Sequence, residues 1–527
     1  MHLFYAFGHV FFNQVQNLLG FLLFLPETLL FVGVFAILYL KCFSFKKISS
    51  NYFFLLEIRA LFLNIVASII YVLLFCLFFL FKNSFYFFVN FSFFVCEFSF
   101  FFKLSLVFIL FILVHFNNFL LHQITSILYE KLLLFFFILF FSYLLLSSFD
   151  LFLIFLNFEG LSLCLYTLII VDTRTQLATE AALKYFCLSG LTSIFFLYGV
   201  SWFYCYAGSV RFIDLRLQIA NFENFSFLSS NSFIVKYALL YILLGLFFKL
   251  SVFPCHLWTP DIYAGGSVPA IIIFAIISKL VAFFLTASFL YFVCYSFLHF
   301  WQGFLLFSGL SSVICGIFGA LKQTNIRRFL GYTSITNFGF ILLGISCGSF
   351  LGFFASFLNV LIYSVQLFCL LILLSLYTKL DNGGFFIEIE YVHQLKGINK
   401  FSSFYYYCLI IVFFSMSGFP PFISFFGKYL LLISLIEAGF SKIVLLLIFF
   451  NIVGFFYYAR LIKLLWFDSE NANYIKVDYS RFIVIGLNKI LAFFIVACII
   501  LIIFFPFLAE SLLCNLFFQL QFLFLLF

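Results

Sequence analysis

The chain has 527 residues, of which 66% are hydrophobic and 9% are charged, and its formal net charge is +8. A soluble domain carries about 25% charged residues because its surface faces water. This composition therefore excludes a water-soluble domain and predicts a protein that crosses a membrane many times. The net positive charge does not indicate a nucleic-acid partner, because no basic run lies beside aromatic platforms.

Apolar stretches of about 20 residues, the length that crosses a hydrocarbon core, recur along the chain. They predict an all-α polytopic membrane protein with about 14 transmembrane helices. The predicted spans are 19–41, 60–81, 99–116, 131–148, 151–171, 181–204, 236–262, 267–296, 301–321, 326–348, 352–379, 403–437, 442–464 and 484–508. Most basic loop residues then fall on one side of the membrane, and the other side receives only Lys82, Lys103, Arg211, Arg216, Lys236 and Lys442. This bias predicts that both chain ends face the cytoplasm or matrix.

The 14 cysteines are scattered singly along the chain, without a CxxC pair. Iron–sulfur clusters and zinc ions are held by closely spaced cysteines, so this spacing argues against either site. The sequence also lacks a GxGxxG and a Walker loop, the usual signatures of dinucleotide and ATP binding. We therefore expect this chain to bind no cofactor of its own.

A few charged residues fall inside the predicted spans, and Glu159, Lys249, Lys279 and Lys428 are the strongest candidates for a function. A lysine at the centre of a spanning helix costs about 2.5–3.5 kcal/mol on insertion scales. Burial lowers the proton affinity of a lysine and a nearby carboxylate raises it, so such residues can load and unload protons. The structural alternatives are snorkelling to the headgroups and a static buried ion pair.

The seventh and twelfth predicted spans contain prolines that should interrupt a helix. Pro254 follows Lys249 in the seventh span, and the run Gly-Phe-Pro-Pro at 418–421 precedes Lys428 in the twelfth. His256 lies beside the first break, where a neutral imidazole can relay protons, although a hydrogen-bonded structural histidine is an equal alternative.

Broken helices at corresponding places in two halves are typical of transporters built from inverted repeats. Five spans separate the two breaks, and an odd repeat length makes the second repeat inverted. The predicted organisation is helices 1–3 in residues 1–127, a first five-helix repeat (helices 4–8) in 128–298, a second inverted five-helix repeat (helices 9–13) in 299–466, and helix 14 with the tail in 467–527.

Several stretches resemble NADH dehydrogenase subunit 2, an antiporter-like membrane subunit of respiratory complex I. They are NFEGLSLCLYTLII (157–170), TEAALKYF (179–186), FKLSVFPCHLWTPDIYAGGSVP (248–269), IISKL (276–280), LKQTNIRRFLGYTSITNFGFILLG (321–344) and GFPPFISFFGKYLLL (418–432). The resemblance implies that Glu159 matches the fifth-helix glutamate that couples to the neighbouring subunit. It further implies that Lys249, Lys279 and Lys428 match the lysines of helices 7, 8 and 12 on a proton-translocation axis.

One departure from the family pattern concerns Asn337. The family commonly reads SSIxHxGY where this chain reads TSITNFGF, so Asn337 replaces a histidine and Phe340 replaces a tyrosine. If that histidine carries protons between Lys279 and Lys428, water or another side chain must do so here.

The resemblance implies a proton-translocating membrane-arm subunit of NADH:ubiquinone oxidoreductase (complex I) that carries no redox centre itself. The complex would use NADH, FMN, iron–sulfur clusters and ubiquinone on other subunits. The expected partners are other membrane-arm subunits, including two related antiporter-like subunits, and membrane lipids.

The abundance of phenylalanine fits an AT-rich organelle gene, so we expect the mitochondrial inner membrane, with a bacterial inner membrane as the alternative. Two other functions stay open on the sequence: a cation/proton antiporter subunit with no redox partner, and a quinone-binding subunit with a direct catalytic role.

Overall fold

The computed structural model describes residues 26–35, 86–88, 92–95, 97–120, 125–173, 176–221, 230–380, 386–388, 390–396, 403–466, 482–484 and 492–504. Within these residues, nine helices are long and apolar enough to cross a membrane. The chain is therefore a multi-pass membrane protein, as predicted. The predicted span 60–81 lies outside the described residues, and the first and fourteenth spans are described only as the short helices Pro26–Phe35 and Ala492–Phe504.

Unbroken helices occupy most of the predicted spans. They are α4 (Glu97–Leu120), α5 (Thr125–Ser147), α6 (Leu151–Thr173), α7 (Gln176–Ala207), α13 (Leu298–Leu321), α14 (Ile326–Ser346), α15 (Phe350–Leu376) and α18 (Ser441–Trp466). Polar side chains fix where some of them begin. The Asn325 side chain accepts hydrogen bonds from the backbone N–H groups of Arg327 and Arg328, which caps the first turn of α14.

The seventh and twelfth spans are interrupted where the prolines predicted it. The seventh consists of α9 (Ser230–Leu250) and α10 (Trp258–Gly265), and the twelfth consists of α16 (Ser403–Ser417) and α17 (Ile423–Glu437). The peptide bonds before Pro254 and Pro421 are cis. Both interruptions end a helix because proline has no N–H to donate and its ring clashes with the preceding turn.

The carbonyls freed at these breaks are bonded by residues that follow each break. The carbonyl of Phe248 accepts a hydrogen bond from the Trp258 indole at 3.0 Å, and the carbonyl of Ser415 accepts one from the Ser424 hydroxyl. Each of these two carbonyls also accepts a backbone bond, from the N–H of Ser251 at 3.0 Å and from that of Gly418 at 3.2 Å. One backbone donor and one side-chain donor from the second half-helix therefore bond each carbonyl in an apolar interior.

The eighth span is continuous but changes its winding twice. It runs through α11 (Val268–Ile272), the π-helical turn η2 (Ile273–Ile277), α12 (Ser278–Ser288) and a second π-helical turn, η3 (Phe289–Val293). A short 3-10 turn, η4 (Tyr295–Phe297), connects it to α13. Single π turns inside α-helices are frequent at functional sites, and here η2 ends at Ile277, two residues before Lys279.

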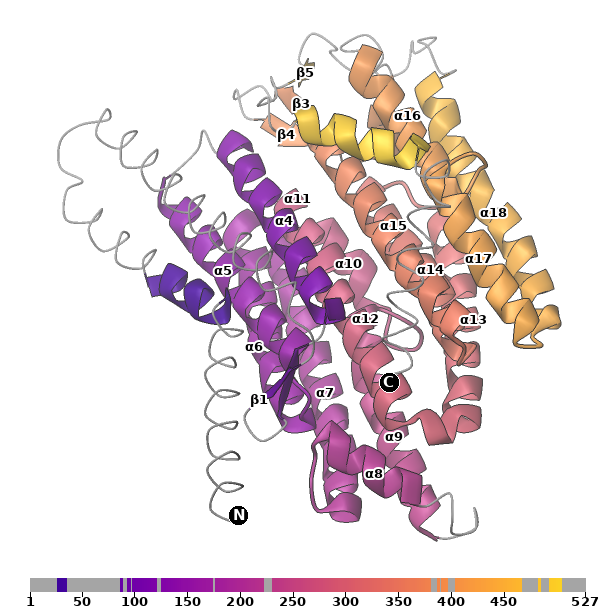
Figure 1. Cartoon of the computed structure of the whole chain (residues 1–527). Coiled ribbons are helices and arrows are strands. Elements are labelled where there is room, and N and C mark those ends of the chain that lie inside the picture. The colour runs from indigo at the N-terminus through magenta and orange to yellow at the C-terminus, as the bar shows by residue number, and fades with distance from the viewer. Residues whose placement is uncertain are drawn as a thin grey trace, which may run out of the picture. The chain divides into compact units, whose positions relative to one another are not determined.

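The chain forms two compact units, one built from residues 1–172 and 196–238 and the other from 173–195 and 239–527. In unit 1, α4 packs against α5. In unit 2, α14 packs between α13 and α15, α15 packs on α17, and α18 contacts α13 and α16 (Figure 1). Small residues allow the close approach of α13 and α14, since a Cβ at Gly316 would meet Thr336 at 2.5 Å.

The described residues also include five short strands, all in connections between helices. In unit 1, β1 (Tyr86–Phe88) pairs antiparallel with β2 (Phe93–Val95). In unit 2, β3 (Tyr377–Leu380) lies between β4 (Phe386–Glu388) and β5 (Phe482–Val484), antiparallel to both. The remaining connecting elements are the helix α8 (Phe212–Asn221) and the 3-10 turn η5 (Val392–Leu395). The all-helical prediction therefore holds for the spans and not for these loops.

The first break supplies a stability test. Trp258→Phe keeps an aromatic ring in the buried cluster but leaves the Phe248 carbonyl without the indole donor. The backbone N–H of Ser251 still donates to this carbonyl at 3.0 Å, so the loss is that of one hydrogen bond, about 0.5–1.5 kcal/mol. We expect a lower thermal midpoint for the purified protein in detergent. The exposed Trp466 serves as the control, and equal midpoints for Trp258→Phe and Trp466→Phe would contradict the role of the hydrogen bond.

Candidate functional site

Lys279 is the most deeply buried of the predicted site residues, with none of its surface exposed. Its amine donates hydrogen bonds to the hydroxyl of Ser251 at 2.6 Å and to that of Ser334 at 3.0 Å. The rings of Phe338 and Tyr263 lie 4.7 and 5.9 Å from the amine. This ammonium group is therefore held by neutral hydroxyls and ring faces, and no ion pair involves it within the described residues.

Ser251 occupies an unusual backbone position at the end of α9. Its φ of 60° lies in the left-handed region, which costs a residue other than glycine about 1–2 kcal/mol. This conformation ends the helix directly after Leu250 and places the buried Ser251 hydroxyl against Lys279. Backbone strain of this kind is typical of functional sites, where the surrounding structure holds it in place.

Lys249 lies on the last turn of α9, buried to 7% exposure within an aromatic cluster of unit 2. Its amine is 5.9 Å from the centre of the Tyr185 ring and 5.8 Å from that of Phe248. Those two rings stack on each other, and Trp258 packs against both. Ring faces attract a cation, so they supply part of the solvation that Lys249 loses inside the protein.

Lys428 lies on α17, two turns beyond the second break, and it is half-buried. Its amine is 5.7 Å from the centre of the Phe340 ring on α14. Gly418 has a φ of 81°, and a Cβ added there would lie 3.0 Å from the Lys428 amine. The break therefore brings the backbone of the interrupted span against the lysine, and glycine leaves the room for it.

A small cavity beside Lys428 contains the position where the family has histidine. It has a volume of about 10 Å³, which is near the minimum of about 10–15 Å³ for one water molecule. Its polar lining comes from Thr336, Asn337, Ser417, Lys428, Asn451, Tyr457 and Tyr458. The Asn337 amide donates to the carbonyl of Thr333 at 3.0 Å, so this side chain bonds its own helix while it lines the cavity.

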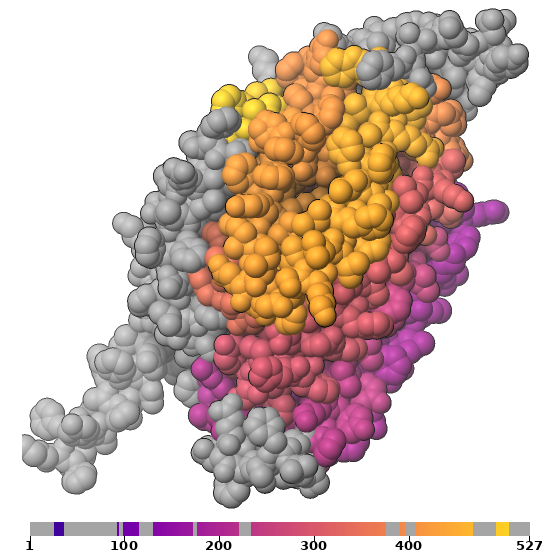
Figure 2. Space-filling model, turned by 90° about the vertical axis from the view of Figure 1, so that its right-hand side faces the viewer, coloured from indigo at the N-terminus to yellow at the C-terminus, as the bar shows by residue number. Residues whose placement is uncertain are grey.

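Helix α14 connects the surroundings of the two lysines. Ser334 contacts Lys279, Asn337 lines the cavity, and Phe340 faces Lys428. Residues three apart on a helix are neighbours offset by about 60°, so these three side chains form a strip that winds along α14 from one amine to the other. Figure 2 shows the face of unit 2 formed by α16 to α18, which is hollowed between these helices. The cavity residues Ser417, Lys428 and Asn451 come from the same three helices.

His256 lies between α9 and α10, half-buried, with its ring stacked on Phe253 at 5.7 Å. Its Nδ1 is buried and has no hydrogen-bond partner among the described residues. The same break that shapes Ser251 therefore leaves an imidazole nitrogen free to accept or donate. Its part in a proton path stays a prediction.

Glu159 lies on α6 in unit 1, half-buried, and its Oε1 is buried with no hydrogen-bond partner among the described residues. The following Gly160 permits this position, because a Cβ there would lie 2.4 Å from the Phe141 ring of α5. Lys249 belongs to the other unit, so the predicted coupling of Glu159 to Lys249 stays a prediction.

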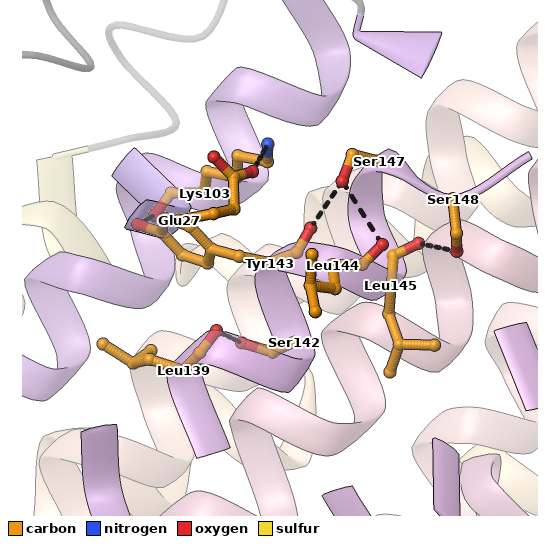
Figure 3. A network of polar contacts seen from close by, with 9 residues as sticks. All are labelled: Glu27, Lys103, Leu139, Ser142, Tyr143, Leu144, Leu145, Ser147 and Ser148. Atoms are coloured by element: carbon orange, nitrogen blue, oxygen red, sulfur yellow. Dashed lines mark hydrogen bonds and ion pairs between the residues drawn. The ribbon is translucent and has the colours of Figure 1, made fainter. Parts of the chain in front are cut away.

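Two lysines lie differently from what the sequence suggested. Lys184, which also falls in a predicted span, is 45% exposed and pairs with Glu180 at 2.8 Å and Asp261 at 2.9 Å. It is a surface ion pair and not part of the buried site. Lys103, which we predicted to be a loop charge, lies fully buried on α4 and pairs with Glu27 (Figure 3). A hydropathy profile follows the order of residues in the sequence, so it cannot show that two charged residues pair inside the folded protein.

The serines that hold Lys279 were missed by the sequence analysis. Ser251 stands in the motif FKLSVFP and Ser334 in GYTSITN, and serine is common enough in membrane helices that neither attracts attention. Their positions in the sequence could have indicated them, because each serine lies in a motif that also contains a candidate residue or a helix break. Within the described residues, no group of three His, Cys, Asp or Glu side chains is placed to hold a metal ion.

The sequence model of the NADH:quinone oxidoreductase/Mrp antiporter transmembrane region matches residues 148–454, which is more than half of the chain. The chain belongs to this family. The matched range of this chain contains all five predicted site residues and both broken helices.

Curated relatives narrow the placement within the family. The chain is 33% identical over 328 residues to NADH-quinone oxidoreductase subunit N of Azoarcus sp. (strain BH72), covering 60% of this chain and 64% of that protein. It is 32% identical over 352 residues to subunit N of Ruthia magnifica subsp. Calyptogena magnifica, covering 66% and 70%. The matched stretch thus spans just under two thirds of the first relative's length.

The fold agrees with a solved family structure. A chain of respiratory complex I from Thermus thermophilus superposes with a TM-score of 0.72 at 22% identity, covering 92% of this chain and 98% of that one. At this identity the likeness establishes the fold alone. The antiporter-like membrane fold predicted from the sequence is confirmed.

The Lys279 site generates a test of the strain at Ser251. Ser251→Ala and Ser251→Gly both remove the hydroxyl that accepts from Lys279, but only glycine relieves the positive φ. We expect Ser251→Gly to be more stable than Ser251→Ala by about 1 kcal/mol. Thermal unfolding of the two purified variants measures this difference. Equal stabilities would mean that the backbone relaxes when the hydroxyl is lost.

Proposed function

We propose that this chain is a proton-translocating subunit in the membrane arm of an NADH:quinone oxidoreductase. It carries no redox centre and couples quinone reduction elsewhere in the complex to proton movement through buried residues. The observation that supports this function best is the arrangement along α14. Lys279 contacts Ser334 of this helix and Lys428 contacts Phe340, and the cavity residue Asn337 lies between these two positions.

This arrangement can move a proton without a cofactor. The hydroxyls of Ser251 and Ser334 are both donors and acceptors, so they can receive a proton from the Lys279 ammonium while passing on their own. One water in the cavity, bonded by the polar lining beside Asn337, can take the place of the missing imidazole next to Lys428. Both lysines lie inside the protein, where a neutral amine is more accessible than in water.

The alternative function is a cation/proton antiporter subunit without a redox partner. The family name includes Mrp antiporters, and the buried lysines suit both functions. We favour the oxidoreductase because the curated relatives described above are named subunit N of NADH-quinone oxidoreductase. Co-purification of the chain with NADH:quinone reductase activity supports the first function. Isolation in a complex without that activity supports the second.

The assembly would contain other membrane-arm subunits, among them two related antiporter-like subunits. NADH, FMN, iron–sulfur clusters and ubiquinone would bind to other chains of the complex. We place the complex in the mitochondrial inner membrane on the strength of the phenylalanine-rich composition. The bacterial inner membrane is the alternative, because the relatives described above are bacterial.

The function is tested at Lys279. Lys279→Met keeps a flexible chain of similar length and removes the proton-carrying amine, so assembly and NADH oxidation should persist in part. The protons moved per electron should fall, measured with the complex in sealed vesicles. Lys442→Met, an exposed lysine on α18, is the matched control and should pump normally. A normal proton-to-electron ratio for Lys279→Met would refute the role of this lysine.

The second break is tested with two glycines. Gly418 and Gly439 have φ values of 81° and 86°, but a Cβ would contact Lys428 only at Gly418 and would meet nothing within 4 Å at Gly439. Replacing either by alanine should cost about 1–2 kcal/mol of stability because of the positive φ. Only Gly418→Ala should also displace the lysine amine and lower the proton-to-electron ratio. Equal pumping by both variants would show that the position of the amine is unimportant.

A further inference from the structure

Unit 1 contains a buried ion pair that the proposed path does not use. The Lys103 amine on α4 donates to Glu27 Oε1 at 2.5 Å, with Lys103 fully buried and Glu27 3% exposed (Figure 3). Glu27 lies on the short helix Pro26–Phe35, so the pair joins the predicted first and third spans. Both residues precede residue 128, where the first predicted repeat begins. The pair is therefore separate from the residues that resemble the family's proton axis.

Among the described residues, two aromatic rings lie near the Lys103 amine. The Lys103 amine lies 5.8 Å from the centre of the Phe100 ring and 5.6 Å from that of Tyr143. Tyr143 on α5 is the titratable side chain that faces the pair, and its hydroxyl donates to the backbone carbonyl of Lys103 at 2.7 Å. This hydroxyl hydrogen is therefore committed to the backbone and does not bond the carboxylate.

One carboxylate oxygen of the pair stays unsatisfied. Glu27 Oε2 is buried and accepts no hydrogen bond from any residue that the structure describes. A buried ion pair that serves only to hold helices together needs hydrogen bonds to its remaining oxygen, since desolvation otherwise outweighs the attraction. An open carboxylate oxygen next to an ammonium group, inside a membrane protein, is instead a place where a proton can bind.

We propose that Glu27 and Lys103 form a second proton-exchange site, located in unit 1 and additional to Lys279 and Lys428. A proton that binds Glu27 Oε2 converts the carboxylate to a neutral carboxylic acid. The Lys103 ammonium stays a hydrogen-bond donor to Oε1. The proton that enters at Oε2 forms an O–H bond there, and its release from Oε2 restores the ion pair, so charge and atoms balance. The inference rests on the proposed function, because a second exchange site has a use only in a protein that moves protons.

The experiment removes both charges together in the full complex. Glu27→Gln with Lys103→Met replaces the pair by neutral chains of similar shape, which avoids leaving one charge buried alone. We expect assembly and NADH oxidation to persist and the protons moved per electron to fall. Tyr143→Phe is the matched control, because it removes a buried hydrogen bond at the same place and keeps both charges. It should lower the thermal midpoint and leave the ratio unchanged.

A normal proton-to-electron ratio in the double variant would overturn the proposal and leave a static ion pair. An equal loss in Tyr143→Phe would overturn it as well, because packing would then explain the effect. Should the double variant fail to assemble, Glu27→Asp is tested by the same proton-to-electron ratio. This variant keeps the charge but shortens the side chain by one methylene. A lowered ratio supports the proposal, and a normal ratio refutes it. Lys279→Met, measured in parallel, separates failure of this site from failure of the proposed function.

Discussion

The structure depends on the rule that every backbone polar group inside a membrane must find a partner within the protein. Continuous helices satisfy the rule by themselves, and most spans of this chain are continuous. Two spans are not, and at each break a side chain from the second half-helix bonds a freed carbonyl. Trp258 does so at Phe248, and Ser424 does so at Ser415. Satisfying the backbone in this way leaves the lysines beside the breaks available for other contacts.

The breaks also determine what surrounds each lysine. At the first, the left-handed conformation of Ser251 directs its hydroxyl to Lys279, and at the second, Gly418 leaves room for the Lys428 amine. Neither amine takes part in an ion pair within the described residues, whereas Lys103 and Lys184 do. An amine held by hydroxyls and ring faces gives up its proton more readily than one held by a carboxylate. The contacts thus divide these lysines into those held by carboxylates and those held by hydroxyls or ring faces.

Helix α14 carries the residues that connect the surroundings of the two lysines. Its contact with α13 is close because glycines take the place of larger side chains there, so α14 is held firmly. The strip of Ser334, Asn337 and Phe340 then has a fixed position between the two broken spans. The replacement of histidine by Asn337 changes the chemistry on this face while the adjoining cavity keeps a polar lining. A polar lining is thus present even where one residue of the family pattern differs.

The sequence by itself determined the class of protein, the spans described here, the positions of both breaks and the family. These follow from local features, namely runs of apolar residues, prolines without an N–H, and motifs read along the chain. The tertiary structure decided which charges pair. Lys103 reads as a loop charge and is buried against Glu27, 76 residues away in the chain, while Lys279 meets a serine 28 residues before it and another 55 residues after it. Such pairings depend on which helices pack together, and hydropathy carries no information about that packing.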